Sequence, residues 1–112
     1  MEIVSRCGRF RLTYQQDGNL VGYENGSQPF WALNMDGLNV NFGAEPPGRA
    51  VVQEDGNFVV YTAYKRPIFA SNTNGHGQRP FRLTMQDDRN IVLYDGANQP
   101  LWASNTNLQQ QW

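Results

Sequence analysis

The chain has few charged residues and no excess of either sign. Charged residues make up 17% of its 112 positions, whereas a globular domain carries about 25%. Nine basic side chains stand against ten acidic ones, which gives a net charge of −1. Because there is no basic excess to neutralise phosphates, the composition argues against nucleic acid and against anionic membranes as partners.

Cysteine and histidine each occur once, as Cys7 and His76. A single cysteine cannot form an intrachain disulfide, and one cysteine with one histidine cannot assemble a zinc site. We therefore expect no metal and no cofactor. Cys7 is predicted to be a small, partly buried residue, and His76 is predicted to lie in a glycine-rich loop.

Long apolar runs are absent too, and amides take the place of the missing charge. No run of about 18 or more apolar residues occurs, so no transmembrane helix is expected. The first residues lack the basic-then-apolar order of a signal peptide, which predicts a cytoplasmic protein, one exported without a leader, or a chain numbered after processing. The 12 Asn and 10 Gln residues supply uncharged donors and acceptors, which suit a neutral polar ligand.

One pattern, Q-x-D-x-N-x-V-x-Y, occurs three times in the chain. Its copies begin at Gln15, Gln53 and Gln86. Self-similarity at such intervals indicates one supersecondary unit used three times. We expect a single domain over residues 1–112, with repeats at approximately 9–34, 49–72 and 81–107. Each copy is followed, at the same distance, by one aromatic residue: Trp31, Phe69 or Trp102.

The residues around each copy are typical of β-strands. Val, Ile, Tyr, Phe and Trp are prominent, whereas strong helix formers are scarce. Asp-Gly in the first two copies is a strong hairpin signal, and Asp88-Arg89 takes its place in the third. A third strand is expected to carry each trailing aromatic residue, and 39–42 could form a fourth strand. The strands predicted beside the turns are Arg9–Gln15, Leu20–Glu24, Arg49–Gln53, Phe58–Ala63, Phe81–Gln86 and Ile91–Asp95.

Alternation along these strands groups the pattern residues. Residues two apart share a face, so the Asn, Val and Tyr of each copy point one way and the hairpin brings Gln and Asp beside them. Leu20, Phe58 and Ile91 point the other way and are expected to form the core with the trailing aromatic residues. Two amides, a carboxylate, a phenol and an aliphatic wall suit a sugar. The fifteen candidate residues are Gln15, Asp17, Asn19, Val21, Tyr23, Gln53, Asp55, Asn57, Val59, Tyr61, Gln86, Asp88, Asn90, Val92 and Tyr94.

The triple pattern with its trailing Pro-x-Trp-Ala-Ser-Asn-Thr resembles the monocot mannose-binding, bulb-type (snowdrop-agglutinin-like, B-type) lectin family. The resemblance runs from about Arg9 to Asn107. It implies a β-prism II fold, with three antiparallel sheets of about four strands around a pseudo-threefold axis. It also implies binding of mannose or mannose-rich glycans, without catalysis. By this resemblance Asp and Asn would bind the axial 2-hydroxyl, Gln the 2- and 3-hydroxyl side, Tyr the 4-hydroxyl, and Val the ring carbons.

The chain departs from this family at its ends and in one core position. It has no disulfide, only about ten residues precede the first repeat, and Phe69 stands where the family has Trp. The sequence ends on Trp112. We hypothesise that one terminus completes a sheet that lacks a strand, and that this strand is exchanged in a homodimer.

Other functions remain open at this level. The fold could serve as a lectin-like defence or bacteriocin-type module that docks on a surface polysaccharide. A glycoside hydrolase needs two carboxylates about 5–10 Å apart, but the pattern aspartates occur one per repeat, and the adjacent Asp87 and Asp88 would face opposite ways on a strand. The Asp-Gly-Asn segments could also serve only their own turns, which would leave a structural descendant without working sites.

Overall fold

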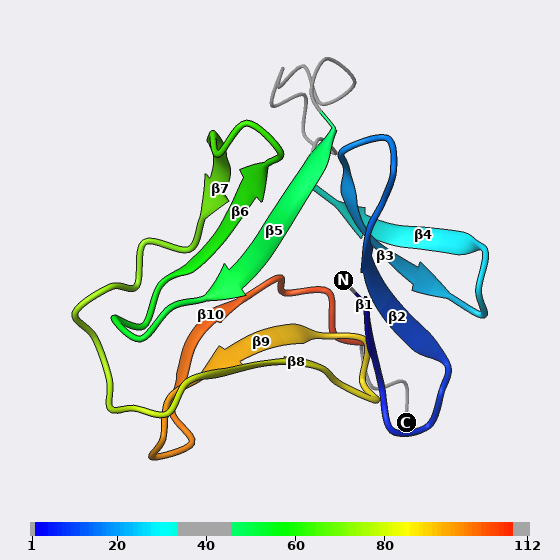
Figure 1. Ribbon diagram of the computed structural model, residues 1–112. Coiled ribbons are helices and arrows are strands. Elements are labelled where there is room, and N and C mark those ends of the chain that lie inside the picture. The colour runs from blue at the N-terminus through cyan, green and yellow to red at the C-terminus, as the bar shows by residue number, and fades with distance from the viewer. Residues whose placement is uncertain (1, 34–45, 109–112) are drawn as a thin grey trace.

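The computed structural model describes residues 2–33 and 46–108, which form strands and no helix. No described segment is a helix long and apolar enough to cross a membrane. The strands make three antiparallel sheets that surround a common centre (Figure 1). The first sheet holds β1 (Glu2–Val4), β2 (Phe10–Tyr14), β3 (Leu20–Glu24) and β4 (Gln28–Ala32), the second β5 (Pro47–Val52), β6 (Phe58–Thr62) and β7 (Pro67–Ala70), and the third β8 (Arg82–Met85), β9 (Ile91–Tyr94) and β10 (Pro100–Ala103).

Each repeat supplies one sheet, as the family resemblance implies. The strands expected beside the pattern turns are confirmed to within two residues at each end, and β3 coincides with its prediction. The first sheet has four strands, and the described parts of the other two have three each. The fourth strand expected at 39–42 lies outside the described residues.

The three pattern turns share one backbone conformation. Gly18 and Gly56 have φ angles of 86° and 92°, and Arg89 takes the same place with φ 77°. Glycine enters this left-handed region freely, whereas a residue with a Cβ is strained there. Asp-Gly is therefore the expected sequence for the turn, and the arginine of the third copy requires compensation from its contacts.

The centre of the molecule is filled from all three sheets. Trp102 makes edge-to-face contacts with Trp31 and Phe69, at centroid distances of 6.1 and 5.6 Å. All three pack against the buried core, which confirms their predicted place. A phenylalanine at position 69 thus keeps the aromatic contact. The pattern residues that alternate toward this core are at most 1% exposed: Leu20, Phe58 and Ile91.

The first sheet fills its part of the core with side chains of different sizes from those of the other two sheets. Gly22 stands between the Val and Tyr of its pattern, where the other copies carry the fully buried Val60 and Leu93. A Cβ on Gly22 would lie 2.7 Å from Cζ of Phe30. The counterpart of Phe30 in the second repeat is the smaller Ile68. In the first sheet the large ring of Phe30 therefore fills the space that Gly22, which has no side chain, leaves open.

The N-terminal strand completes the first sheet within the same chain. β1 pairs antiparallel with β2, and a tight turn closed by a bond from Gly8 N to Ser5 O (2.9 Å) joins them. Cys7 lies in this turn and is exposed, so the prediction of a partly buried residue is wrong. The turn between two short strands leaves the side chain on the surface, while the backbone N–H of Cys7 donates to Asp87 Oδ1 at 2.9 Å.

Candidate functional site

The three pattern copies lie on the hairpins β2–β3, β5–β6 and β8–β9, one on each sheet (Figure 1). Exposure is the same in every copy. The Asp is exposed, the Val is buried, and the Gln, Asn and Tyr are half-buried. The structure therefore places the five predicted residues of each copy in equivalent positions, three times over.

The glutamine and tyrosine of each copy meet across the hairpin. Gln53 Nε2 donates to the Tyr61 hydroxyl at 2.8 Å, and Gln86 Nε2 donates to the hydroxyl of Tyr94. In the first copy the Tyr23 hydroxyl donates to Oε1 of Gln15. The amide of Gln15 is reversed because its Nε2 faces the Asp17 carboxylate, 3.2 Å from both oxygens.

Each pattern aspartate closes its own turn. One oxygen, Oδ1, accepts the backbone N–H of the asparagine two residues later, at 2.9 to 3.0 Å in all three copies. Turn chemistry is therefore real, as the alternative interpretation expected. It uses only part of the group, because a carboxylate offers about four acceptor positions. The exposed aspartate retains acceptor capacity for a ligand.

The asparagine carbonyl holds the end of the third strand. Asn57 Oδ1 accepts from Ser71 Oγ at 3.1 Å and from Asn72 N at 2.9 Å. Asn90 is bonded in the same way by Ser104 Oγ at 3.3 Å. Sequence reasoning missed this role, although Ser-Asn-Thr follows both copies at the same distance. The bonds occupy the carbonyl and leave the amide NH₂ as the donor of the site.

The first copy lacks this serine. Leu33 takes its place and is buried in the core, at 3% exposure. Asn19 therefore does not receive the serine bond that orients Asn57 and Asn90. The first site is built on the same hairpin but with a different support behind its asparagine.

The pattern valines form the floor of each site. They are buried, on the strand that also carries the tyrosine, rather than standing as an exposed wall. Only a small aliphatic surface is left for a ligand at this point. The exposed fractions are 4% for Val21, 5% for Val59 and 3% for Val92.

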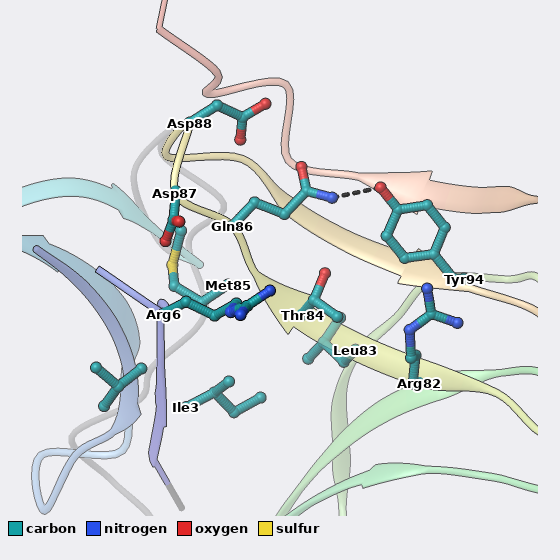
Figure 2. A pocket seen from close by; sticks show the side chains of 11 residues that line it. Ile3, Arg6, Arg82, Leu83, Thr84, Met85, Gln86, Asp87, Asp88 and Tyr94 are labelled. Carbon is teal, nitrogen blue, oxygen red and sulfur yellow. Dashed lines mark hydrogen bonds between the residues drawn. The ribbon is translucent and has the colours of Figure 1, made fainter. Parts of the chain in front are cut away.

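Grooves open beside the second and third copies. One of about 730 Å³ runs along β8 and contains Gln86, Asp88 and Tyr94 (Figure 2). Another of about 480 Å³ contains Tyr61 of the second copy. A third, of about 420 Å³, reaches Gln53. The pattern side chains of these two copies therefore border open space and are not enclosed by their own hairpins.

An arginine stands opposite the tyrosine in every copy, a feature that sequence reasoning missed. Residues directly opposite in an antiparallel pair share a face. The guanidinium of Arg82 lies 4.7 Å from the ring centroid of Tyr94, an attractive cation–π geometry. An arginine four residues before each pattern glutamine is the sequence signal that could have revealed it. The cross-strand pairs are Arg11–Tyr23, Arg49–Tyr61 and Arg82–Tyr94.

A buried carboxylate shapes the turn after the third tyrosine. Asp95 is 1% exposed. Its Oδ1 accepts from the backbone N–H of Gln99 at 2.8 Å and of Ala97 at 2.9 Å, and its Oδ2 from that of Gln78 at 3.1 Å. These bonds, that of Gln99 foremost, lower the pKa of Asp95 below its ordinary value despite burial. Thr62 caps the same turn of the second repeat with its hydroxyl.

Comparison with known proteins gives relatives over most of the chain. No family model matches. A mannose-specific lectin from Aloe arborescens is 42% identical over 66 residues, 59% of this chain and 54% of that protein, so the match spans about half the length of this curated relative. The solved structure of a monomeric monocot mannose-binding lectin from Gastrodia elata is 33% identical, with a TM-score of 0.76, over 96% of this chain and 94% of that chain.

The mannose-specific agglutinin from snowdrop (Galanthus nivalis) bulbs, solved with methyl-α-D-mannoside, is also 33% identical. Its TM-score is 0.67, over 97% of this chain and 94% of that chain. Such identity over nearly the full length of both chains, with three antiparallel sheets in common, confirms the predicted β-prism II fold. The chain belongs to the monocot mannose-binding, bulb-type lectin family.

Proposed function

We propose that the chain is a lectin that binds mannose and mannose-containing glycans at up to three sites, one per pattern copy. The observation that carries this proposal is the recurrence, on three sheets, of an exposed aspartate beside a joined glutamine–tyrosine pair. The snowdrop relative was solved with a mannoside, and the Aloe relative is named mannose-specific. All fifteen pattern residues are assigned to these sites.

The hydrogen-bonding groups of the sites suit vicinal hydroxyls, which both donate and accept. In the second and third copies the aspartate keeps acceptor positions, and the asparagine, whose carbonyl oxygen accepts from a serine, keeps its NH₂. The tyrosine hydroxyl and glutamine amide complete the set. In the family arrangement, Asp and Asn take the axial 2-hydroxyl, Gln the 2- and 3-hydroxyl side, and Tyr the 4-hydroxyl. The valine floor would meet the ring carbons.

Shallow sites of this kind bind one sugar weakly. Three of them on one molecule would gain affinity for a branched glycan, because each later contact is made at a high effective concentration. We therefore assign the chain to multivalent recognition of mannose-rich surfaces. The relatives are named mannose-specific or mannose-binding lectins, which favours this function over a bacteriocin-type docking module.

The proposed activity is binding without catalysis. The relatives are named lectins. Each pattern aspartate belongs to a different sheet, whereas glycoside hydrolysis needs two carboxylates about 5–10 Å apart across one bond. The relatives and the separation of the aspartates among the sheets both support a role in binding alone.

Calorimetry with methyl-α-mannoside and a branched mannan tests the proposal. Asp17, Asp55 and Asp88 are each changed to Ala, singly and together. We expect the number of mannoside sites to fall stepwise and mannan binding to disappear in the triple variant. Glu54→Ala is the matched control, since it removes the neighbouring, exposed carboxylate. Undiminished mannan binding by a folded triple variant would contradict the assignment.

We also propose a homodimer with an exchanged terminal strand. Because the N-terminal strand β1 pairs with β2 of its own chain, the exchange is assigned to the C-terminal end. Within the described residues, β8 is an edge of the third sheet, and an edge strand offers unpaired N–H and C=O groups to another chain. The half-exposed Val4 of β1 lines the groove along β8. Light scattering at micromolar concentration should give twice the mass of one chain. A mass of one chain would exclude the exchange.

A further inference from the structure

We infer that the second site continues past Tyr61 into a subsite for an anionic group, so that it selects mannose glycans that carry a phosphate or a carboxylate. The inference rests on the proposed function, because it extends the same site. In the proposed function the pattern residues bind a neutral sugar. What lies beyond the tyrosine is a groove of different chemistry.

This groove has a cationic lining. It measures about 480 Å³, and Arg49 and Lys65 line it beside Tyr61, with no acidic side chain among the lining residues. Lys65 is the single lysine of the chain. At Gly48 the wall is bare backbone, since a Cβ there would lie 2.2 Å from Thr62 O. The groove therefore offers two positive charges next to the phenol.

The strand pairing brings Arg49 to the site. It is the direct partner of Tyr61 across β5 and β6, and opposite residues have Cβ atoms about 4.5–5.5 Å apart on one face. Tyr61 is in turn held by Gln53. In a sugar bound to the pattern residues, the side that contacts Tyr61 would therefore also face the guanidinium of Arg49.

Neither cation is neutralised by another described residue. Arg49 and Lys65 are exposed, and neither takes part in an ion pair in the part of the chain that the structure describes. Four other arginines do have carboxylate partners. These ion pairs are Arg9–Glu24, Arg11–Glu2, Arg79–Glu54 and Arg89–Glu24.

The third site also has an arginine beside its tyrosine, but its groove carries less net positive charge. Arg82 lies against Tyr94 at one end of its groove, and Asp88 lies at the other (Figure 2). Asp87 also lines that groove. Acidic groups there offset the basic ones, whereas the second groove has none in its lining. The second site is therefore the one to which the anionic subsite is assigned.

Arginine and lysine recognise anions in complementary ways. A guanidinium binds a phosphate or a carboxylate through two parallel hydrogen bonds, and an ammonium adds a compact charge. The anion could be a phosphate ester on the mannose itself or the carboxylate of an adjoining acidic sugar. Both present negatively charged oxygens at the tyrosine side of the site.

The experiment isolates the second site in the variant D17A/D88A. Calorimetry measures its Kd for methyl-α-mannoside, for the 6-phosphate of that mannoside, and for a glucuronic acid–mannose disaccharide. We expect at least one anionic ligand to bind about tenfold more tightly than the neutral one, as a charge-assisted bond predicts. The ratio should shrink as salt is raised from about 0.05 M to about 0.5 M, because salt screens exposed charges.

Adding R49Q and K65Q should bring this ratio close to one. The control R9Q removes one charge that Glu24 already neutralises and should keep the ratio. Equal Kd values for neutral and anionic ligands in D17A/D88A would overturn the inference and leave mannose binding intact. A preference that survives R49Q and K65Q would overturn it as well. Binding of no ligand by the folded D17A/D88A variant would overturn the inference by showing that the second site is inactive, whereas failure of the wild-type protein to bind methyl-α-mannoside would contradict the proposed function itself.

Discussion

The pattern aspartate has an observed role in its turn and a proposed role in sugar binding. Its Oδ1 closes the turn by accepting a backbone N–H, and the side chain is exposed in all three copies. The turn bond and the sugar binding proposed above are therefore compatible in one side chain. A residue with one carbonyl oxygen in the same position would keep the first role and change the second.

Asp55→Asn separates these roles. The amide oxygen can still accept the N–H of Asn57, so the midpoint of urea unfolding should stay close to that of the wild type. The charge and one acceptor are lost, so mannoside binding at the second site should weaken by about tenfold or more. Calorimetry in the D17A/D88A background gives the Kd. An unchanged Kd in Asp55→Asn would show that the carboxylate serves only its turn.

At the scale of the strand, the first hairpin shows that the repeats are not interchangeable residue by residue. Gly22 faces Phe30, whereas the second sheet sets Val60 beside Ile68. Gly22 with Phe30 and Val60 with Ile68 fill equivalent positions in the core. The pair of residues is therefore the unit of packing, and changing one member alone should overfill the core.

Gly22→Val should destabilise the protein by about 1–3 kcal/mol, the usual penalty for overpacking. Its Cβ alone would lie 2.7 Å from Cζ of Phe30. The double variant G22V/F30I copies the second repeat and should recover most of the lost free energy of unfolding, measured by urea denaturation. The packing explanation is wrong if the double variant is no more stable than Gly22→Val.

At the scale of the whole molecule, one carboxylate joins two sheets. Glu24, at the end of β3, pairs with Arg9 of its own sheet and lies 3.5 Å from Nη1 of Arg89 in the third pattern turn. Arg89 also donates to Thr106 O at 2.9 Å. These contacts explain how an arginine occupies a left-handed position that the other copies give to glycine.

The pH dependence of Tm in Glu24→Gln tests whether Glu24 links the first and third sheets. Arg9, by its hydrogen bond and its charge, and Arg89 lower the pKa of Glu24. The stabilisation is therefore present above the ordinary pKa of a glutamate, about 4.3, and is lost as pH falls through the lower folded-state pKa. Glu24→Gln should lower the Tm at pH 7 and flatten the decline of Tm below about pH 4.

Glu54→Gln is the matched control for this variant. It breaks a single pair with Arg79 in which the side chains are 89% and 67% exposed, and such surface pairs contribute little. We expect its Tm profile between pH 2 and pH 7, measured by circular dichroism, to match that of the wild type. If Glu24→Gln shows the same profile as this control, Glu24 does not link the sheets.

Local signals were enough to predict the strands, the turns and the inward face. Alternation placed Leu20, Phe58 and Ile91 in the core, and Asp-Gly marked the turns, because both effects act between residues close in sequence. The grouping of the fifteen candidate residues followed from the same alternation. Cys7 was misplaced because its exposure depends on how the tight turn between β1 and β2 lies on the surface, which composition does not report.

Tertiary structure decided the remaining features. The bond from Ser71 to Asn57 spans 14 residues, and the meeting of Arg49 with Tyr61 depends on the register of β5 against β6. The sequence by itself determined which side chains share a strand face, since that follows from a period of two. Only the assembled sheets decided which side chains from different strands touch, because register and inter-sheet packing are set by the whole core rather than by near neighbours.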